Sequence, residues 1–160
     1  MHSFETLTTM NVNTSTDVEI RAAGQKGQGV FALRPFRQGE TVVVGRRVGV
    51  YDQRTIYSIQ VDWEVHVEMD EPAIRINHSD CPTTGVQDNA WGAFDFVALR
   101  EIAAGEEITF DYETTESDLT TSFQECCPPR TGQTARKGFS SLPQVVREAY
   151  GEFVANYLKS

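Results

Sequence analysis

Short runs of β-branched and aromatic residues, separated by glycines, fill the chain from residue 17 to residue 112 and restrict what it can fold into. Each run has the length of a strand, and none has room for a long helix. Glycines between the runs predict tight turns. We therefore expect a mainly β domain. The expected strands are Val18–Ala22, Val30–Leu33, Thr41–Val44, Arg47–Tyr51, Ile56–Val61, Glu64–Glu68, Ala93–Arg100 and Glu107–Tyr112.

The pattern changes near the C-terminus, where apolar residues recur every three or four positions from Leu142 onward. That spacing predicts an amphipathic helix over 141–158. Ser141 and Gln144 have the spacing of a capping box at its start. Gly151 weakens the middle of such a helix by about 1 kcal/mol relative to alanine, so we expect the helix to depend on docking against the β domain.

The composition is that of one acidic domain of 160 residues, with 39% hydrophobic residues and a formal net charge of −9. Nucleic-acid binding is not expected, because phosphate contacts require clustered Lys and Arg. The negative charge is compatible with a basic peptide partner, and it is equally well explained as an aid to solubility. No run approaches the roughly twenty apolar residues of a membrane span, and no targeting signal is seen, so we expect a cytoplasmic or otherwise intracellular protein.

Three segments carry candidate chemistry, and the first is the glycine-rich stretch 24–29. Its glycines follow the order G-x-x-G-x-G, and a β run stopped by Pro35 comes next. A dinucleotide-binding loop instead has G-x-G-x-x-G before a helix, so that interpretation fails. The stretch is typical of a tight turn, or of a backbone that a ligand can approach because no Cβ intervenes.

The other two segments are Arg75–Ser79 and Gly105–Tyr112. The former offers the neutral polar side chains of Asn77 and His78 on a loop. The latter is an alternating run, so its apolar side chains share one face of a strand that ends in Tyr112. A tyrosine held there can position an amine or a sulfonium without carrying charge, which suggests a methyl-transfer site.

Other kinds of site are not favoured. His78, Ser79 and Asp80 are the residue types of a hydrolase triad, but adjacent side chains point in different directions and cannot form the relay. Acidic residues alternate with apolar ones over 62–71, which predicts a solvated strand face or, as an alternative, a surface that attracts a basic peptide. No C-x-x-C or H-x-x-x-H spacing links the remaining candidate ligands, so free thiols are expected rather than a metal site. Those ligands are His66, His78, Cys81, Cys126 and Cys127.

In combination, the three segments resemble the SET domain, the fold of a large class of S-adenosylmethionine-dependent protein-lysine methyltransferases. Residues 26–32 are similar to the family's G-x-G motif, 75–79 to its R-F-I-N-H-S motif and 105–112 to its G-E-E-L-T-F-D-Y motif, in the same order. The resemblance implies a mainly β fold of several short curved sheets with a pseudoknot-like active site, plus the C-terminal α-helix. It is closest in kind to small stand-alone bacterial-type members.

The resemblance divides the chain into four parts. They are a flexible N-terminal tail over 1–16, the SET domain over 17–116, a post-SET-like loop segment over 117–140, and the helix over 141–158 docked on the domain.

Two departures from the family pattern concern zinc. The N-H-S-C-x-P-N pattern has Asp80 in place of its zinc-binding cysteine and Thr83 in place of its last asparagine. The cysteine-rich post-SET segment is degraded to Cys126 and Cys127. A four-thiolate zinc site needs four ligands and the chain has three cysteines, so we expect no metal.

The resemblance also implies a role for each motif residue. Tyr112 takes the catalytic position, and Phe123 stacks on the adenine of S-adenosylmethionine. Phe110 stands where the family has Phe or Tyr, which implies a product beyond monomethyl-lysine. The remaining methyl-donor residues are Lys26, Gly27, Gln28, Gly29, Asn77 and His78, and the other candidates for the wall of the substrate channel are Tyr51 and Tyr57.

The expected substrate is a lysine-containing protein or peptide, bound without nucleic acid or membrane. The alternative, motivated by Asp80 and Thr83, is a catalytically impaired SET-like module that binds a protein partner.

Overall fold

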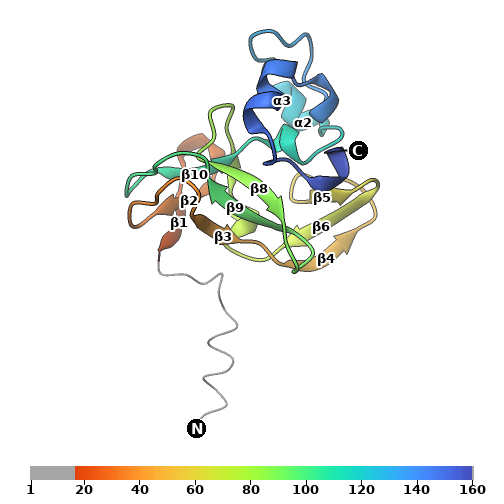
Figure 1. Ribbon diagram of the computed structural model, residues 1–160. Coiled ribbons are helices and arrows are strands. Elements are labelled where there is room, and N and C mark those ends of the chain that lie inside the picture. The colour runs from red at the N-terminus through yellow and green to blue at the C-terminus, as the bar shows by residue number, and fades with distance from the viewer. Residues whose placement is uncertain (1–16, 160) are drawn as a thin grey trace.

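Three small sheets organise residues 17–159, which are the residues that this computed structural model describes. The strands are β1 (Val18–Ala22), β2 (Gln28–Ala32), β3 (Thr41–Val44), β4 (Arg47–Tyr51), β5 (Ile59–Asp62), β6 (Val65–Met69), β7 (Asn77–His78), β8 (Thr84–Asp88), β9 (Phe94–Ala98) and β10 (Glu107–Phe110). Their orders are β1-β2-β10-β7, β3-β9-β8 and β4-β6-β5 (Figure 1). The mainly β fold class is confirmed. The tail predicted over 1–16 lies outside the described residues.

The first sheet brings the three motifs together. Strand β2 pairs antiparallel with β10, so that Val30 lies opposite Ile108. On its other edge β10 pairs in parallel with β7, which places Phe110 opposite His78. The polar loop and the end of the alternating strand are therefore neighbours in space.

The hydrophobic core lies between the sheets. Side chains with no exposed surface come from all three, including Val30 and Ile108 of the first sheet, Phe96 of the second and Val67 of the third. Burying one such side chain stabilises the fold by about 1.5–3 kcal/mol. Short alternating strands can each contribute only a few of these residues, which explains why the domain uses three sheets around one core.

Strands β7 and β8 were not predicted from the sequence. With two residues, β7 is too short to show a period, and Gly85 interrupts β8. A Cβ on Gly85 would lie 2.6 Å from Cβ of Phe153, so this glycine lets the C-terminal segment cross the strand closely.

The acidic strand face predicted over 62–71 is wrong. A turn at Trp63 and Glu64 divides this stretch between β5 and β6, and Glu64 has a positive φ of 61°. His66 and Val67 are both buried although they are consecutive, so the strand has no single solvated face. The alternating sequence pattern did not predict burial here, because side chains on both faces of β6 are buried.

The long C-terminal helix is also wrong in extent. Helix α3 covers only Gln144–Tyr150, and a separate 3-10 turn covers Asn156–Lys159. Gly151 ends α3 with a positive φ of 57°, a conformation that glycine adopts without strain. Ser141 forms no capping box, because Pro143 precedes the helix and makes no side-chain cap.

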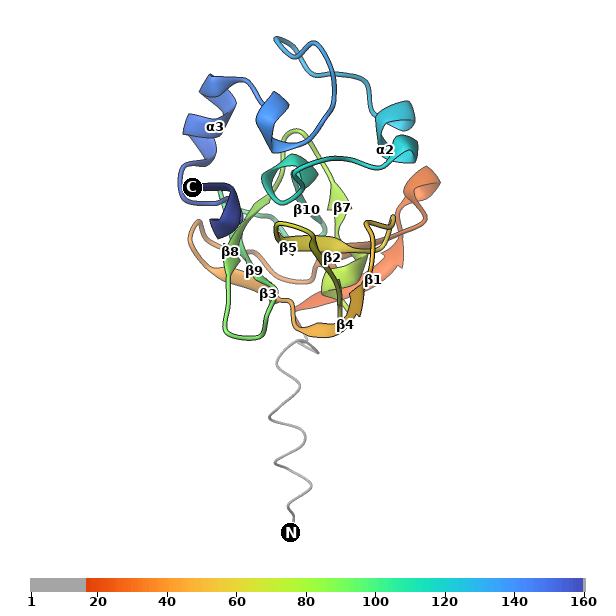
Figure 2. The same ribbon diagram turned by 90° about the vertical axis from the view of Figure 1, so that its right-hand side faces the viewer.

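Helix α2 (Thr121–Cys126) follows the first sheet, and Thr120 caps it by accepting the N–H of Phe123 at 3.2 Å. Figures 1 and 2 show α2, α3 and the segment between them on one side of the three sheets. None of the described helices has the length and apolarity that crossing a membrane requires.

Candidate active site

Both the backbone N–H and the side-chain hydroxyl of Tyr112 are hydrogen-bonded to the motif at 75–79. Strand β10 ends at Phe110, so Tyr112 starts a 3-10 turn instead of ending the strand as the sequence predicted. Its backbone N–H donates to Nδ1 of His78 at 3.0 Å, and its hydroxyl donates to the carbonyl oxygen of Ile76 at 2.8 Å. These two hydrogen bonds fix both the direction and the tilt of the ring.

The hydroxyl of Tyr112 stays protonated at neutral pH. Burial raises its pKa above the ordinary value of 10, and the negative charge of Glu116 raises it further. The ring lies between two aromatic neighbours, with its centroid 4.8 Å from that of Phe110 and 5.7 Å from that of Phe123. Tyr112 can therefore offer a neutral oxygen within an aromatic wall.

His78 is a neutral connector between Tyr112 and Asp80. Because Nδ1 accepts the Tyr112 N–H, the neutral ring carries its proton on Nε2, which lies 2.8 Å from the acceptor Oδ1 of Asp80 and 3.0 Å from Nη2 of Arg136. Burial lowers the pKa of His78, although the nearby Asp111 opposes this shift. The imidazole therefore stays uncharged at neutral pH.

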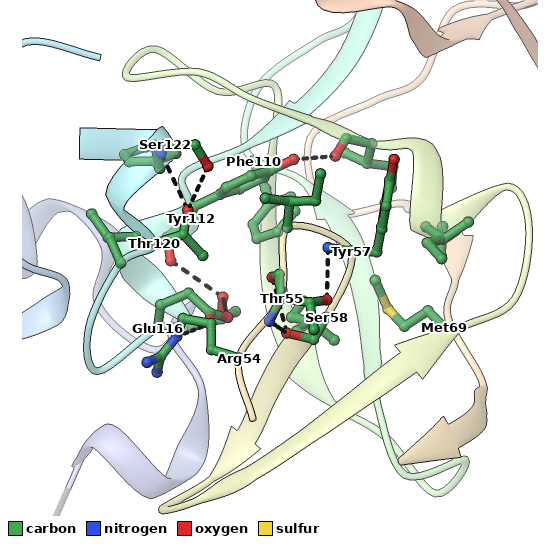
Figure 3. Close-up of a pocket in the computed structure, with 18 residues that line it drawn as sticks. Arg54, Thr55, Tyr57, Ser58, Met69, Phe110, Tyr112, Glu116, Thr120 and Ser122 are labelled. Atoms are coloured by element: carbon green, nitrogen blue, oxygen red, sulfur yellow. Dashed lines mark hydrogen bonds and ion pairs between the residues drawn. The ribbon is translucent and has the colours of Figure 1, made fainter. Parts of the chain in front are cut away.

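An open pocket of 240 Å³ lies against Tyr112 and is lined mostly by apolar side chains, among them Ile56, Ile74 and Leu119. Figure 3 shows the charged pair of Arg54 and Glu116 towards one end of the pocket and Met69 towards the other.

Glu116 is the polar anchor of this pocket wall. Its Oε1 lies 3.1 Å from Nε of Arg54, and its Oε2 accepts the backbone N–H of Gln60 at 2.8 Å. Burial raises the pKa of Glu116, and these contacts oppose that shift. The carboxyl group therefore ties the turn after β10 to strand β5.

The three residues proposed for the channel wall do not all reach this pocket. Phe110 and Tyr57 line it, and Tyr57 is 58% exposed. Tyr51 lies on β4, where its hydroxyl donates to Oε1 of Glu68 at 3.1 Å, and it is not part of the pocket lining.

The residues proposed to bind a methyl donor, apart from Phe123, form one strip from the loop before β2 and the start of β2 to β7. Nδ2 of Asn77 donates to the carbonyl oxygen of Gln28 at 2.9 Å and to Oε2 of Glu107 at 2.8 Å. Glu107 also binds Lys26 through an ion pair of 2.5 Å. A Cβ on Gly29 would lie 2.6 Å from Oε2 of Glu107 and 3.0 Å from Nδ2 of Asn77, so a side chain at position 29 would displace these two polar groups.

Phe123 and Gly27 complete that set. The ring of Phe123 lies edge-on to His78, with centroids 4.9 Å apart. Gly27 has a positive φ of 82°, and no atom lies within 4 Å of the place a Cβ would take. Asn77 and His78 are adjacent in β7, so the glycine-rich loop and the aromatic cluster meet at that strand.

Sequence reasoning missed a charged cluster on the other side of Tyr112. Arg130 and Arg136, from the segment between α2 and α3, contact the carboxylates of Asp80, Asp111 and Glu113. The only signal in the sequence was Asp80, an acidic residue where the family pattern has cysteine. No local spacing connects it with arginines so far along the chain.

Comparisons with known proteins agree on one family. The description "SET domain" belongs to the family model that matches residues 27–113. The chain is 30% identical over 120 residues to the variant-silencing SET domain-containing protein of Plasmodium falciparum, in an alignment that covers 60% of this chain but 5% of that protein.

A solved structure adds evidence for the fold. It is a crystal structure of a Plasmodium falciparum protein described as a candidate histone methyltransferase, with a TM-score of 0.51 and 18% identity. The match covers 61% of this chain and 94% of that chain. The three small sheets of this chain agree with the several short sheets that the resemblance predicts, and the fold matches that solved structure, whereas the bacterial type of this chain stays a prediction.

Proposed function

Because this chain belongs to the SET-domain family, we propose that it transfers a methyl group from S-adenosylmethionine to the side-chain amine of a lysine in a protein. The observation that carries this proposal is the position of Tyr112. Its ring lines an apolar pocket, and both its N–H and its hydroxyl are bound to the motif that precedes it along the chain.

The pocket suits the amine that must react. A free lysine has a pKa of about 10.4, so holding it neutral at pH 7 costs roughly 4–5 kcal/mol in water. Apolar walls such as Ile74 and Phe110 disfavour the charged form and so reduce that cost. A strong general base is then unnecessary.

Tyr112 acts by positioning. Its hydroxyl proton is committed to the carbonyl oxygen of Ile76, so the lone pairs on the hydroxyl oxygen are available to orient the attacking amine. Orientation of this kind counts because in-line transfer needs the reacting atoms aligned at close range. Since the pKa of Tyr112 is raised, the oxygen carries no charge while doing this.

The strip beside β7 fits the methyl donor by its chemistry. S-adenosylmethionine supplies a methyl group on a positively charged sulfur, and its other parts are an amino acid, a ribose and an adenine. Asn77 uses its Nδ2 within the protein, and its Oδ1 offers an acceptor for an ammonium group. Lys26 and the backbone at Gly27 are assigned to the amino-acid end, and the half-buried ring of Phe123 to the adenine.

The test is incubation of the protein with methyl-labelled S-adenosylmethionine and a panel of lysine-rich proteins. We expect label on lysine side chains, identified as methyl-lysine after hydrolysis. The matched control is the same panel with its lysines acetylated beforehand, which removes the nucleophile without removing the proteins. Binding of the cofactor without transfer of label would contradict the enzyme proposal and favour the impaired binding module.

A further inference from the structure

We propose that Arg130 and Arg136 replace a post-SET zinc ion in this chain, and that they position His78 and Phe123 for the methyl donor. We call these two arginines, with the carboxylates of Asp80, Asp111 and Glu113, the arginine clamp. The first half of the inference concerns structure alone, and the second half rests on the proposed function.

The residues at the family's zinc position do not fit zinc. Asp80 replaces a cysteine, Cys81 is exposed and Cys127 is half-buried. Ligand atoms of His78, Asp80 and Asp111 do lie within 4.8 Å of one another. However, Nδ1 of the histidine accepts a backbone N–H and both carboxylates are bound by guanidinium groups, so a cation would meet positive charge there.

Arg136 is the centre of the clamp and is 3% exposed. It binds Asp80 through two hydrogen bonds, of 2.5 Å to Oδ1 and 3.1 Å to Oδ2. Its Nε lies 3.1 Å from Oε1 of Glu113, and its Nη1 donates to the carbonyl oxygen of Pro128 at 3.1 Å. A planar guanidinium can make several such contacts at once, as a lysine ammonium cannot with the same geometry.

Arg130 closes the other side. Its Nη2 donates to Oδ2 of Asp111 at 2.8 Å and to Oε1 of Glu113 at 2.9 Å. Glu113 has no exposed surface, and it also accepts hydrogen bonds from Gln133 and from the backbone N–H of Gly138. One buried carboxylate thus holds the segment 128–142 at several points, which is the task a shared metal ion performs elsewhere.

The clamp reaches the candidate active site directly. Asp111 and Glu113 flank Tyr112 in sequence, so the arginines hold the turn on which the tyrosine sits. Asp80 accepts the Nε2 proton of His78, and the guanidinium of Arg136 lies 5.5 Å from the centre of the Phe123 ring. Removing Arg136 would therefore release His78 and Phe123 together.

Asp80 stays ionised over the ordinary pH range. Hydrogen bonding from Arg136 is the main reason that the pKa of Asp80 falls to about 2. Charge-assisted hydrogen bonds of this kind are roughly twice as strong as neutral ones. Loss of Arg136 would leave the fully buried carboxylate of Glu113 with one cation fewer, and Asp80 without its two hydrogen bonds, so the segment should open more readily.

Hydrogen–deuterium exchange of the whole protein without ligand tests the structural half. In Arg136→Ala we expect the amides of 128–142 to exchange about 10- to 100-fold faster, the range that corresponds to the net loss of about one charged hydrogen bond. Arg136→Lys should restore part of the protection. A matched control is Arg100→Ala, which removes an exposed pair with Glu106 of 2.9 Å and should leave this segment unchanged.

Two results would overturn the structural half. One is unchanged exchange of 128–142 in Arg136→Ala. The other is faster exchange of that segment when a zinc chelator is added to the wild-type protein, because the clamp needs no metal. We expect the chelator to have no effect.

Calorimetry with S-adenosylhomocysteine tests the positioning half. We expect Arg136→Ala to bind it about 10- to 100-fold more weakly, with partial recovery in Arg136→Lys and wild-type affinity in Arg100→Ala. Equal affinity in Arg136→Ala, despite faster exchange, would overturn the positioning role and leave the proposed function intact. If the wild-type protein binds no S-adenosylhomocysteine, the proposed function and this positioning half both fail, whereas the exchange experiment still decides the structural half.

Discussion

The two sides of Tyr112 are built on opposite principles. On one side lies the apolar pocket, whose wall includes Ile74 and Leu119 and is open to solvent. On the other lies the arginine clamp, where the Nη atoms of two arginines donate hydrogen bonds to three carboxylates. The difference indicates that the two sides have separate roles. The clamp fixes the position of the turn that carries Tyr112, and the pocket lowers the free-energy cost of keeping the lysine amine neutral. Substitutions on the clamp side should therefore act on stability, and those on the pocket side on chemistry.

The largest expected effect is on the clamp side. Glu113→Ala removes the fully buried one of the two carboxylates that Arg130 and Arg136 share, and breaking a buried pair in this way costs about 3–5 kcal/mol in the free energy of unfolding. Chemical denaturation measures it. The matched control is Glu106→Ala, an exposed pair with Arg100 that should cost about 0–1 kcal/mol. Equal losses in the two variants would contradict the special role of the clamp.

Tyr112→Phe should separate chemistry from structure. It deletes the hydroxyl that donates to Ile76 and keeps the ring that packs between Phe110 and Phe123. Loss of one positioned polar group at a reacting centre lowers kcat by about 10²–10³-fold, and affinity for S-adenosylmethionine should change little. Steady-state kinetics decides the matter. Tyr51→Phe is the control, because Tyr51 lies outside the pocket. A similar loss of kcat in Tyr51→Phe would show that Tyr51 does contribute to the substrate channel.

The comparison also explains what the sequence could predict. Strands such as β1, β3 and β4 were predicted with their observed bounds, because each depends on a local run of β-branched residues between turn signals. The motifs are local too, and pairing of β7 with β10 brings two of them, 75–79 and 105–112, together at Tyr112. The prediction of a long C-terminal helix was wrong because it gave more weight to the apolar periodicity than to Gly151. The positive φ of this glycine lets the chain leave the helix.

The clamp could not be predicted, since it depends on distant partners. Arg136 meets Asp80 across 56 positions of the chain, and neither residue has a neighbour that signals the pair. Strand β7 escaped prediction for the same reason, because its two residues are ordered by pairing with β10. The pocket walls come from several loops, so only the folded chain identifies Ile56 or Leu119 as members.

A smaller effect is expected within the pocket itself. Phe110→Tyr adds a hydroxyl to a ring that is 4% exposed and lies 5.2 Å from the Phe96 centroid, and such overpacking costs about 1–3 kcal/mol. If Phe110 leaves the room that allows more than one methyl group, the variant should shift the product towards monomethyl-lysine. Mass spectrometry of a peptide substrate measures this. An unchanged methylation state would contradict the assignment of Phe110 to the channel.

The smallest expected effect is on the titration of His78, which joins the two sides. Burial lowers its pKa below 6.5, so at acidic pH the unfolded chain binds a proton that the folded chain does not. Stability should therefore fall as pH decreases through about 6.5, by at most roughly 1.4 kcal/mol per pH unit for this group. His66 is shifted in the same direction, so NMR titration of each imidazole is needed to separate them.

The Arg136→Ala variant tests whether the two sides of Tyr112 are coupled. Opening of the clamp would hydrate His78, and loss of the guanidinium would remove a positive charge that lowers its pKa. Both changes move the pKa of His78 up, towards 6.5. Protonation of Nδ1 would also end its acceptance of the Tyr112 N–H, so mild acid should weaken the hold on the tyrosine sooner in the variant than in the wild type. A His78 pKa that does not rise in Arg136→Ala would show that the clamp and the tyrosine are independent.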